Sequence, residues 1–356
     1  MLLMIGYLTT PTSVTGVSLA EFWAWVRYLA AITSHDADLR LTRSYADLDA
    51  HQKTILSDDF GMGVPMVWLM QRLPLVEIVD GRYFLQRYGA SHGAHQHRTA
   101  KRGPNKTPDF VARDHGGNWH IMECKGTQSG EIFRARQINS GISQKLSITF
   151  PPGHTGQRLV SGLSIGIEDG NPSHLKIIDP EPEDSVIISE NELEFAKDAA
   201  TRGVMAKLLR STGFEIAAEA IASPFGKPQA MPPSRRKADK ERVEYLADRD
   251  RRAREELLAG PSRRRLFSGR YRGREVHFEL PRPIYIHDAA ISKVTVRQGI
   301  NLDALDLLRE QPTIDTLVDP SRNSWIDMMG ENFMYDDEQT ATLKIGEIFR
   351  SELILK

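Results

Sequence analysis

Residues 108–125 have the sequence PDFVARDHGGNWHIMECK, which predicts a β-hairpin. Two short strand-like stretches, 109–113 and 119–125, flank the run DHGGN, whose five residues are strong turn formers. Antiparallel pairing brings Asp109, at the start of the first strand, beside Glu123, near the end of the second. The hairpin is therefore expected to bring two carboxylates together.

The end of the second strand carries the residue types of a hydrolytic metal site. Side chains alternate between the faces of a strand, so Glu123 and Lys125 share one face and Cys124 points to the other, into the core. Asp109 and Glu123 form the hard oxygen site that Mg²⁺ or Mn²⁺ prefers, with the backbone carbonyl of Cys124 as a third ligand. The Lys125 ammonium can orient an attacking water and offset phosphate charge. The pattern predicts metal-dependent hydrolysis of phosphodiesters.

Apolar periodicity around the hairpin predicts the order helix, three strands, helix, strand. The expected elements are a helix over 44–73, broken near Ser57 and capped again by Ser57-Asp58-Asp59, strands over 75–79 and 83–85, the hairpin, a helix over 131–146, and strands over 158–167 and 174–178. A strand over 1–5 and an amphipathic helix over 19–32 precede them. The second half is expected to contain helices over 191–209, 237–258 and 302–310 and strands over 266–280, 293–296 and 342–353.

These elements suggest three regions. Residues 1–44 form an N-terminal strand and helix, and residues 45–180 form an α/β core that ends at the run PEPE. Residues 181–356 form an additional α+β C-terminal region that includes a basic segment, 227–274.

The hairpin motif and its flanking elements resemble the PD-(D/E)xK nuclease superfamily. Pro108-Asp109 and the pattern Glu123-Cys124-Lys125 each occur once in the chain, and Glu123 follows Asp109 by fourteen positions. The resemblance covers residues 45–180 and the element order α-β-β-β-α-β. It implies a restriction-endonuclease-like core, a mixed central β-sheet flanked by helices, and Mg²⁺-dependent cleavage of DNA, or less often RNA, leaving 5′-phosphate and 3′-hydroxyl ends.

The resemblance also implies further site residues. In that family an acidic residue from the first core helix often joins the metal site, and Asp59 or its neighbour Asp58 fills this place here. A glutamine on the helix after the motif recurs in some branches, and Gln137, or Gln144 as the second choice, corresponds to it.

Basic residues are concentrated in two stretches of a chain that is otherwise acidic. Of 46 Lys and Arg against 47 Asp and Glu in the whole sequence, segment 227–274 holds 16 against 7. Residues 81–108 contain no acidic residue, and three histidines, His92, His95 and His97, accompany the basic ones. Such blocks are typical of a surface that binds a polyanion. The residues expected to contact nucleic acid are Arg98, Lys101, Arg102 and Lys106.

Composition excludes several other classes of protein. The chain has 356 residues, of which 40% are hydrophobic and 26% charged, and one cysteine, which excludes a disulfide framework and a cysteine-based zinc site. Its apolar runs are shorter than the roughly 20 residues of a membrane span. We therefore expect a soluble, cytoplasmic protein with no membrane partner, acting on DNA as a homodimer or as a subunit of a multi-protein complex.

Three readings of the function compete. The first is a DNA endonuclease, for which restriction or phage defence, transposition and repair are candidate settings. The second is a catalytically silent nuclease-fold subunit that binds nucleic acid without cutting it, and a third class, an assembly subunit whose basic segment is only a tether, predicts no dependence on divalent cations.

Overall fold

The computed structural model describes residues 1–12, 19–33, 38–91, 107–144, 147–181, 185–222, 237–259, 264–286, 289–310, 328–337 and 339–356. The helices are α1 (Leu2–Thr9), α2 (Ala20–Tyr28), η1 (Leu29–Ala31), α3 (Arg43–Ala46), α4 (Ala50–Met70), α5 (Gly81–Ser91), α6 (Glu131–Gln144), η2 (Glu190–Glu192), α7 (Leu193–Ser211), α8 (Glu215–Ala222), α9 (Lys237–Ala259) and α10 (Leu302–Glu310). The strands are β1 (Arg40–Leu41), β2 (Leu75–Asp80), β3 (Phe110–Asp114), β4 (Trp119–Thr127), β5 (Ser147–Thr149), β6 (Thr155–Ser164), β7 (Gly166–Ile167), β8 (His174–Ile178), β9 (Ser185–Ile187), β10 (Arg264–Leu266), β11 (Tyr271–Ile286), β12 (Ala289–Asn301), β13 (Phe333–Asp336), β14 (Thr340–Ile345) and β15 (Phe349–Leu355).

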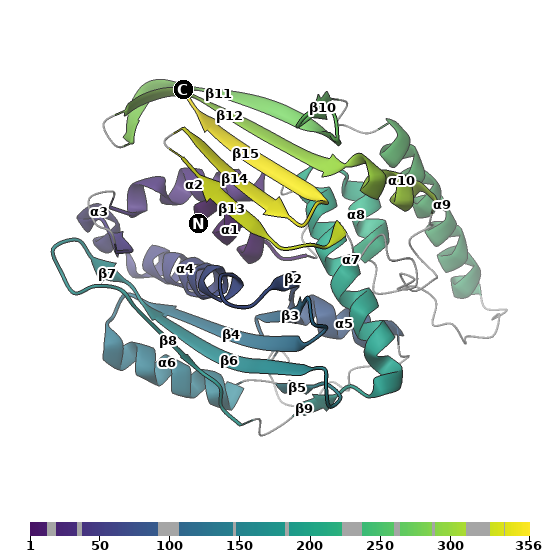
Figure 1. Cartoon of the computed structure of the whole chain (residues 1–356), viewed down its shortest axis with the longest axis horizontal. Helices are drawn as coiled ribbons and strands as arrows, with labels where there is room; N and C mark the ends of the chain where they lie inside the picture. Colours follow the sequence, from purple (N-terminus) through teal and green to yellow (C-terminus); the bar gives the residue numbers. More distant parts are fainter. Residues whose placement is uncertain are drawn as a thin grey trace.

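The chain is α/β, with a mixed five-stranded sheet in the order β2-β3-β4-β6-β8 (Figure 1). The predicted hairpin is confirmed, because β3 and β4 pair antiparallel with Phe110 opposite Met122. Strand β6 then pairs parallel to β4, and β8 runs antiparallel to β6. Helix α6 makes the crossover that a parallel pair requires. The sheet is therefore mixed and flanked by helices.

Helices α4 and α6 cover opposite faces of β4 (Figure 1). On the α4 face, the helix approaches so closely that a Cβ at Gly126 would lie 1.8 Å from the Ser57 carbonyl oxygen. On the α6 face, a Cβ at Gly141 would lie 3.6 Å from Cγ of Glu123. The end of β4 is thus held between two helices, and glycine is needed at Gly126 because no other residue fits under α4.

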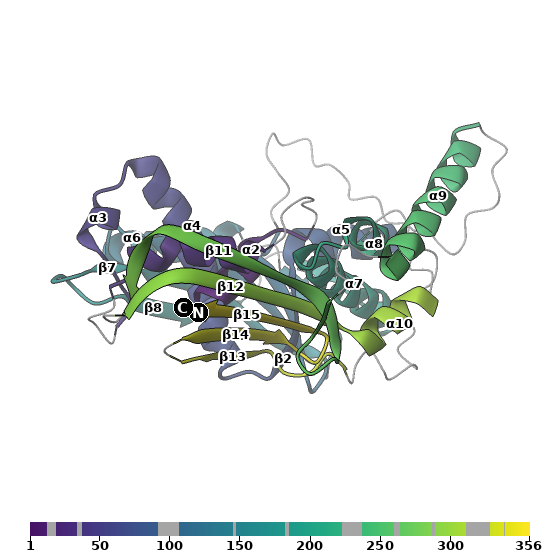
Figure 2. The same ribbon diagram turned by 90° about the horizontal axis from the view of Figure 1, so that it is seen from above.

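A second sheet, in the order β10-β11-β12-β15-β14-β13, is antiparallel throughout and curves into half a barrel (Figure 2). Helices α1, α2 and α7 lie between the two sheets (Figure 1). The Phe22 ring on α2 stacks on the Phe278 ring of β11, with centroids 4.5 Å apart. One continuous cluster of buried side chains contains residues from the N-terminal helices, the central sheet and the C-terminal sheet.

Three sequence-based assignments were wrong. Residues 1–5 lie in helix α1 and not in a strand, because its Leu3–Leu8 run is buried on every side and a short apolar run without periodicity does not distinguish the two structures. Residues 83–85 belong to helix α5, where the Asp80 carboxylate accepts the Tyr83 N–H at 2.8 Å and caps the first turn. Helix α4 runs unbroken through Ser57, and its cap is Asp49, whose side chain accepts the His51 and Gln52 amides.

The other expected elements are found with shifted ends. Segment 342–353 proved to be two strands, β14 and β15, joined by a tight turn in which Gly346 has φ +50°. None of the helices in the described ranges is long and apolar enough to cross a membrane.

Candidate active site

The β3–β4 hairpin brings three of the residues named from sequence into contact. The Cys124 amide donates to Oδ2 of Asp109 at 2.7 Å, which ties the start of the first strand to the end of the second. On the α6 face of β4, Nζ of Lys125 lies 2.7 Å from Oε1 of Glu123. Asp109, Glu123 and Lys125 therefore form one cluster at the carboxyl end of β4.

The cluster contains two carboxyl groups and one ammonium group, and all three are at least partly buried. Burial and the neighbouring Glu123 carboxylate raise the pKa of Asp109 to about 7, against the opposing effects of the Cys124 N–H and the Lys125 ammonium. Burial disfavours the Lys125 ammonium, yet its contact with Glu123 and the charge of Asp109 outweigh burial and raise the pKa of that lysine. At neutral pH Lys125 therefore stays protonated, and the Asp109 carboxyl is divided between its protonated and ionised forms.

One carboxylate oxygen of the cluster lacks a hydrogen-bond donor. The Glu123 side chain is only 7% exposed, and its Oε2 is buried without a hydrogen-bond partner among the described residues. An unpaired buried carboxylate oxygen costs free energy unless something positive or a donor satisfies it. This oxygen therefore marks the place where the site is incomplete without a ligand.

Of the two candidate aspartates on α4, Asp58 is the one near the cluster. Burial raises the pKa of Asp58, the Lys125 charge lowers it, and the charge of Asp58 in turn raises the pKa of Asp109. Asp59, which the sequence analysis assigned to the site, instead accepts a hydrogen bond from the Tyr28 hydroxyl of α2. The two neighbours differ because successive residues of a helix point about 100° apart.

Gln137 lies beside the end of β4. Its amide donates to the Gly126 carbonyl at 3.2 Å, while its Oε1 is buried without a partner among the described residues. It thus holds α6 against the motif strand and does not contact Glu123 or Asp109 through any described hydrogen bond. The side chain of Gln144 lies outside the described residues.

The Cys124 side chain packs in the core and does not join the polar cluster. Its thiol is buried, and burial followed by the charge of Asp109 raises its pKa, so it stays protonated at neutral pH. Only its backbone can serve the site, through the amide that binds Asp109 and the carbonyl that the sequence analysis proposed as a metal ligand.

The donor chemistry of the cluster fits a hard divalent cation. Asp109 and Glu123 supply carboxylate oxygens, the mutual repulsion of the pair favours binding of a positive charge, and Oε2 of Glu123 awaits a partner. Within the part of the chain that the structure describes, no three His, Cys, Asp or Glu side chains group together as metal ligands. A cation held by Asp109 and Glu123 would need further ligands, and for Mg²⁺ these are usually waters and substrate oxygens.

The residues predicted to bind nucleic acid, Arg98, Lys101, Arg102 and Lys106, lie outside the described residues, as do His92, His95 and His97. Several other basic residues of the two stretches have structural partners. Arg87 pairs with the buried Asp198 at 3.0 Å, and Arg274 donates to the Ser211 carbonyl at 2.7 Å. These arginines stabilise the fold, so charge counts along the sequence overstate the basic surface.

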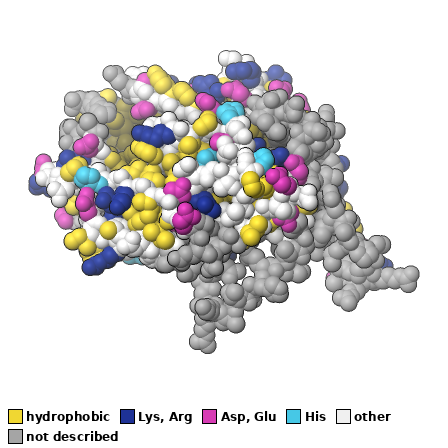
Figure 3. Space-filling model, turned by 60° about the horizontal axis from the view of Figure 1, so that its bottom comes forward, with side chains coloured by type: hydrophobic (Ala, Val, Ile, Leu, Met, Phe, Trp, Pro, Cys, Tyr) yellow, Lys and Arg dark blue, Asp and Glu magenta, His cyan; other side chains and the backbone are white. Residues whose placement is uncertain are grey.

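The described surface on the α6 side of the molecule is of mixed charge. Figure 3 shows Lys and Arg side chains interspersed with Asp and Glu side chains around apolar areas on that face. The apolar part includes Ile132 and Phe133 of α6, which are 70% and 49% exposed.

Sequence reasoning missed the residues that hold the motif strand in place. Gln128, which follows β4, donates through its amide to the Lys53 carbonyl at 3.1 Å and to Ser57 Oγ at 3.2 Å, and so ties the strand end to α4. Nothing in the local sequence pattern distinguishes this glutamine from a solvated one. The close packing of Gly126 against α4 could have been expected from its position directly after Lys125.

Comparison with known proteins gives no relative for this chain. No family model matches it, and neither a curated protein nor a solved structure does. The site is therefore interpreted from its own geometry.

Proposed function

We propose that this chain is a metal-dependent nuclease that hydrolyses phosphodiester bonds of DNA. The observation that carries the proposal is the convergence of Asp109, Glu123 and Lys125 at one end of β4, with a buried carboxylate oxygen that has no partner among the described residues. The mixed sheet with helices on both faces supports a restriction-endonuclease-like core. Within this class we propose an endonuclease of restriction or phage defence.

The side chains divide the work as follows. Asp109 and Glu123 would hold Mg²⁺, or Mn²⁺ in its place, with the Cys124 carbonyl as a further ligand, and the bound ion would supply Lewis-acid stabilisation of the phosphate and a more acidic water. Lys125, kept charged by Glu123, orients the attacking water and offsets charge that develops on the phosphate. Asp58 lies within electrostatic range of Lys125 and is placed to hold water on the α4 side.

The test is cleavage of supercoiled plasmid, linear duplex and single-stranded DNA in Mg²⁺, Mn²⁺ and EDTA. We expect cutting that needs the metal and is lost in Lys125→Ala. Lys197→Ala is the matched control, because Lys197 also lies 2.7 Å from a glutamate, Glu194, but on the surface of α7. Full cutting by Lys125→Ala would contradict the proposal.

Retained DNA binding without cutting would instead favour the silent nuclease-fold subunit. Salt dependence of that binding would separate it from an assembly subunit, because neutralised phosphates release counterions. Absence of both cutting and binding would exclude both nucleic-acid functions.

A further inference from the structure

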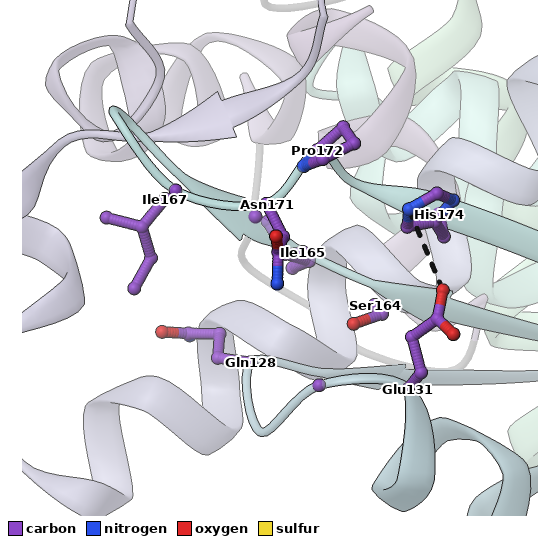
Figure 4. Close-up of a pocket in the computed structure, with 11 residues that line it drawn as sticks. Gln128, Glu131, Ser164, Ile165, Ile167, Asn171, Pro172 and His174 are labelled. Atoms are coloured by element: carbon purple, nitrogen blue, oxygen red, sulfur yellow. Dashed lines mark ion pairs between the residues drawn. The ribbon is translucent and has the colours of Figure 1, made fainter.

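A pocket of about 440 Å³ opens beyond the carboxyl ends of β4 and β6 (Figure 4). Gln128 on its floor follows Lys125 by three residues, which is about 10 Å along an extended chain. Thr127 of β4 pairs with Ser164 of β6, so the strand that carries the catalytic cluster leads directly into the pocket wall. The pocket is therefore within about 10 Å of chain from Lys125, a separation that neighbouring nucleotides of a DNA strand bound at Lys125 can span.

The lining of the pocket suits an uncharged, planar, polar group. Its polar members are the Asn171 amide, the Ser164 hydroxyl, the ion pair between Glu131 and His174, 3.6 Å apart, and Gln128, whose amide nitrogen is already bound to α4. The remaining side chains are aliphatic, and the described residues that line the pocket include no lysine or arginine. Phosphate recognition relies on such cations, whereas base edges are read by amides and hydroxyls and base faces by apolar contact.

Contacts outside the pocket hold its wall in place. The connection from β7 to β8 carries Asn171, and the Gly170 carbonyl just before it accepts a hydrogen bond from Arg40. The Gly166 amide donates to Ser173 Oγ at 2.8 Å, which closes the same loop. Figure 4 shows Asn171 reaching from this loop between Ile165 and Ile167, above Gln128. The Asn171 amide is thus presented on a supported loop.

We propose that this pocket receives one unstacked nucleobase of the strand that is cut, and that Asn171 reads its edge. The inference rests on the proposed nuclease function and specifies its substrate as DNA with an unpaired base next to the scissile phosphate. Taking a base out of an intact duplex costs a few kcal/mol, so a bulged or single-stranded base enters at lower cost. An asparagine amide pairs with N6 and N7 of adenine, which makes adenine the preferred base.

The test measures binding in EDTA, where no cutting occurs. The probes are one duplex with a single bulged adenine and the same duplex with an abasic site at the bulge. We expect wild-type protein to bind the adenine bulge about tenfold more tightly, because a factor of this size lies within the range by which one good amide–base pair discriminates. Asn171→Ala should keep only the part of this preference that comes from apolar contact with the base face, and Asn191→Ala, which alters an exposed asparagine on η2, should behave as wild type.

The outcomes for the pocket and for the nuclease are separable. Equal affinity of wild-type protein for the two probes, or an undiminished preference in Asn171→Ala, overturns the proposal. A preference that Asn171→Ala reduces supports the pocket even if Mg²⁺ brings no cleavage, and in that case only the nuclease function fails. No binding to either probe counts against both.

Discussion

Two clusters of buried charged side chains on the central sheet, one at the β2–β3 pair and one at the end of β4, are satisfied to different degrees. At the β2–β3 pair, the two oxygens of Glu77 accept from Arg113 Nε and from Thr201 Oγ1, each at 2.6 Å. At the end of β4, Glu123 has Lys125 on one oxygen and no described partner on the other, with Asp109 nearby.

The difference is the one expected between a structural charge cluster and the catalytic cluster proposed at the end of β4. Burying a carboxylate is tolerated when each oxygen has a donor, as at Glu77, where α7 supplies Thr201. The β4 cluster instead keeps two carboxylates together, and burial with their repulsion raises the pKa of Asp109 to about 7. A fold gains nothing from such an arrangement unless a cation or substrate completes it.

Replacing the buried glutamate by glutamine should lower activity in the β4 cluster and stability in the β2–β3 cluster. The larger effect is expected on activity. We expect Glu123→Gln to reduce DNA cleavage at least about a hundredfold, since it removes a charge that holds the metal and keeps Lys125 protonated. Its thermal unfolding in EDTA should stay close to that of wild type, because the change relieves repulsion with Asp109. Cleavage rates and calorimetry check both parts, and unreduced cleavage would remove the distinction between the clusters.

Glu77→Gln should act on stability. It leaves the Arg113 guanidinium, which is only 10% exposed, without its anionic partner, and breaking a buried pair typically costs about 3–5 kcal/mol. Urea unfolding measures this loss, while the cleavage rate per folded molecule should not change. A stability equal to wild type would show that Glu77 is not the structural counterpart of Glu123.

Divalent metal should stabilise only the cluster at the end of β4. At a hundred times its dissociation constant, Mg²⁺ is expected to raise the free energy of unfolding by about 2.7 kcal/mol. Melting temperatures with Mg²⁺ and with EDTA give the measurement. The gain should vanish in Asp109→Asn and persist, from a lower baseline, in Glu77→Gln; a gain retained by Asp109→Asn would place the metal elsewhere.

In the absence of metal, the free energy of unfolding should depend on pH through the Asp109 carboxyl, whose pKa is raised. The pKa of Asp109 is about 7 in the folded chain against 3.8 for an ordinary aspartate, so the folded state binds the extra proton between these values. The free energy of unfolding should therefore fall as pH rises from about 4 to 7, by at most about 1.4 kcal/mol per pH unit from this group. Unfolding of Asp109→Asn in EDTA should lack this slope; an identical pH profile for the two proteins would contradict the assignment.

The smallest expected effects distinguish the neighbouring aspartates of α4. Asp58→Asn should lower cleavage about tenfold with little change in stability, since Asp58 acts on Lys125 and Asp109 through its charge. Tyr28→Phe removes the hydroxyl that binds Asp59 and should cost about 1 kcal/mol of stability without lowering activity. Parallel cleavage and unfolding measurements decide between them, and the reverse result would return Asp59 to the site.

The sequence alone determined the hairpin and the clustering of Asp109, Glu123 and Lys125 at its end. Strong turn formers between two short strands set the register, and strand alternation then places Glu123 and Lys125 on one face, opposite to Cys124. These features depend on contacts between residues close in the chain, which local sequence patterns specify.

Only the tertiary structure decided the features that depend on distant partners. The orientation of α4 against β4 and α2 decides which of Asp58 and Asp59 lies near the cluster. The burial of Arg87 depends on its hydrogen bond to Asp198, which is 111 residues away in the sequence. The helical state of residues 2–9 is set by the elements that surround them, because an apolar run satisfies its backbone equally well as helix or strand. The pocket at Asn171 likewise exists only where β4, β6 and the β7–β8 connection meet, a meeting that no local pattern encodes.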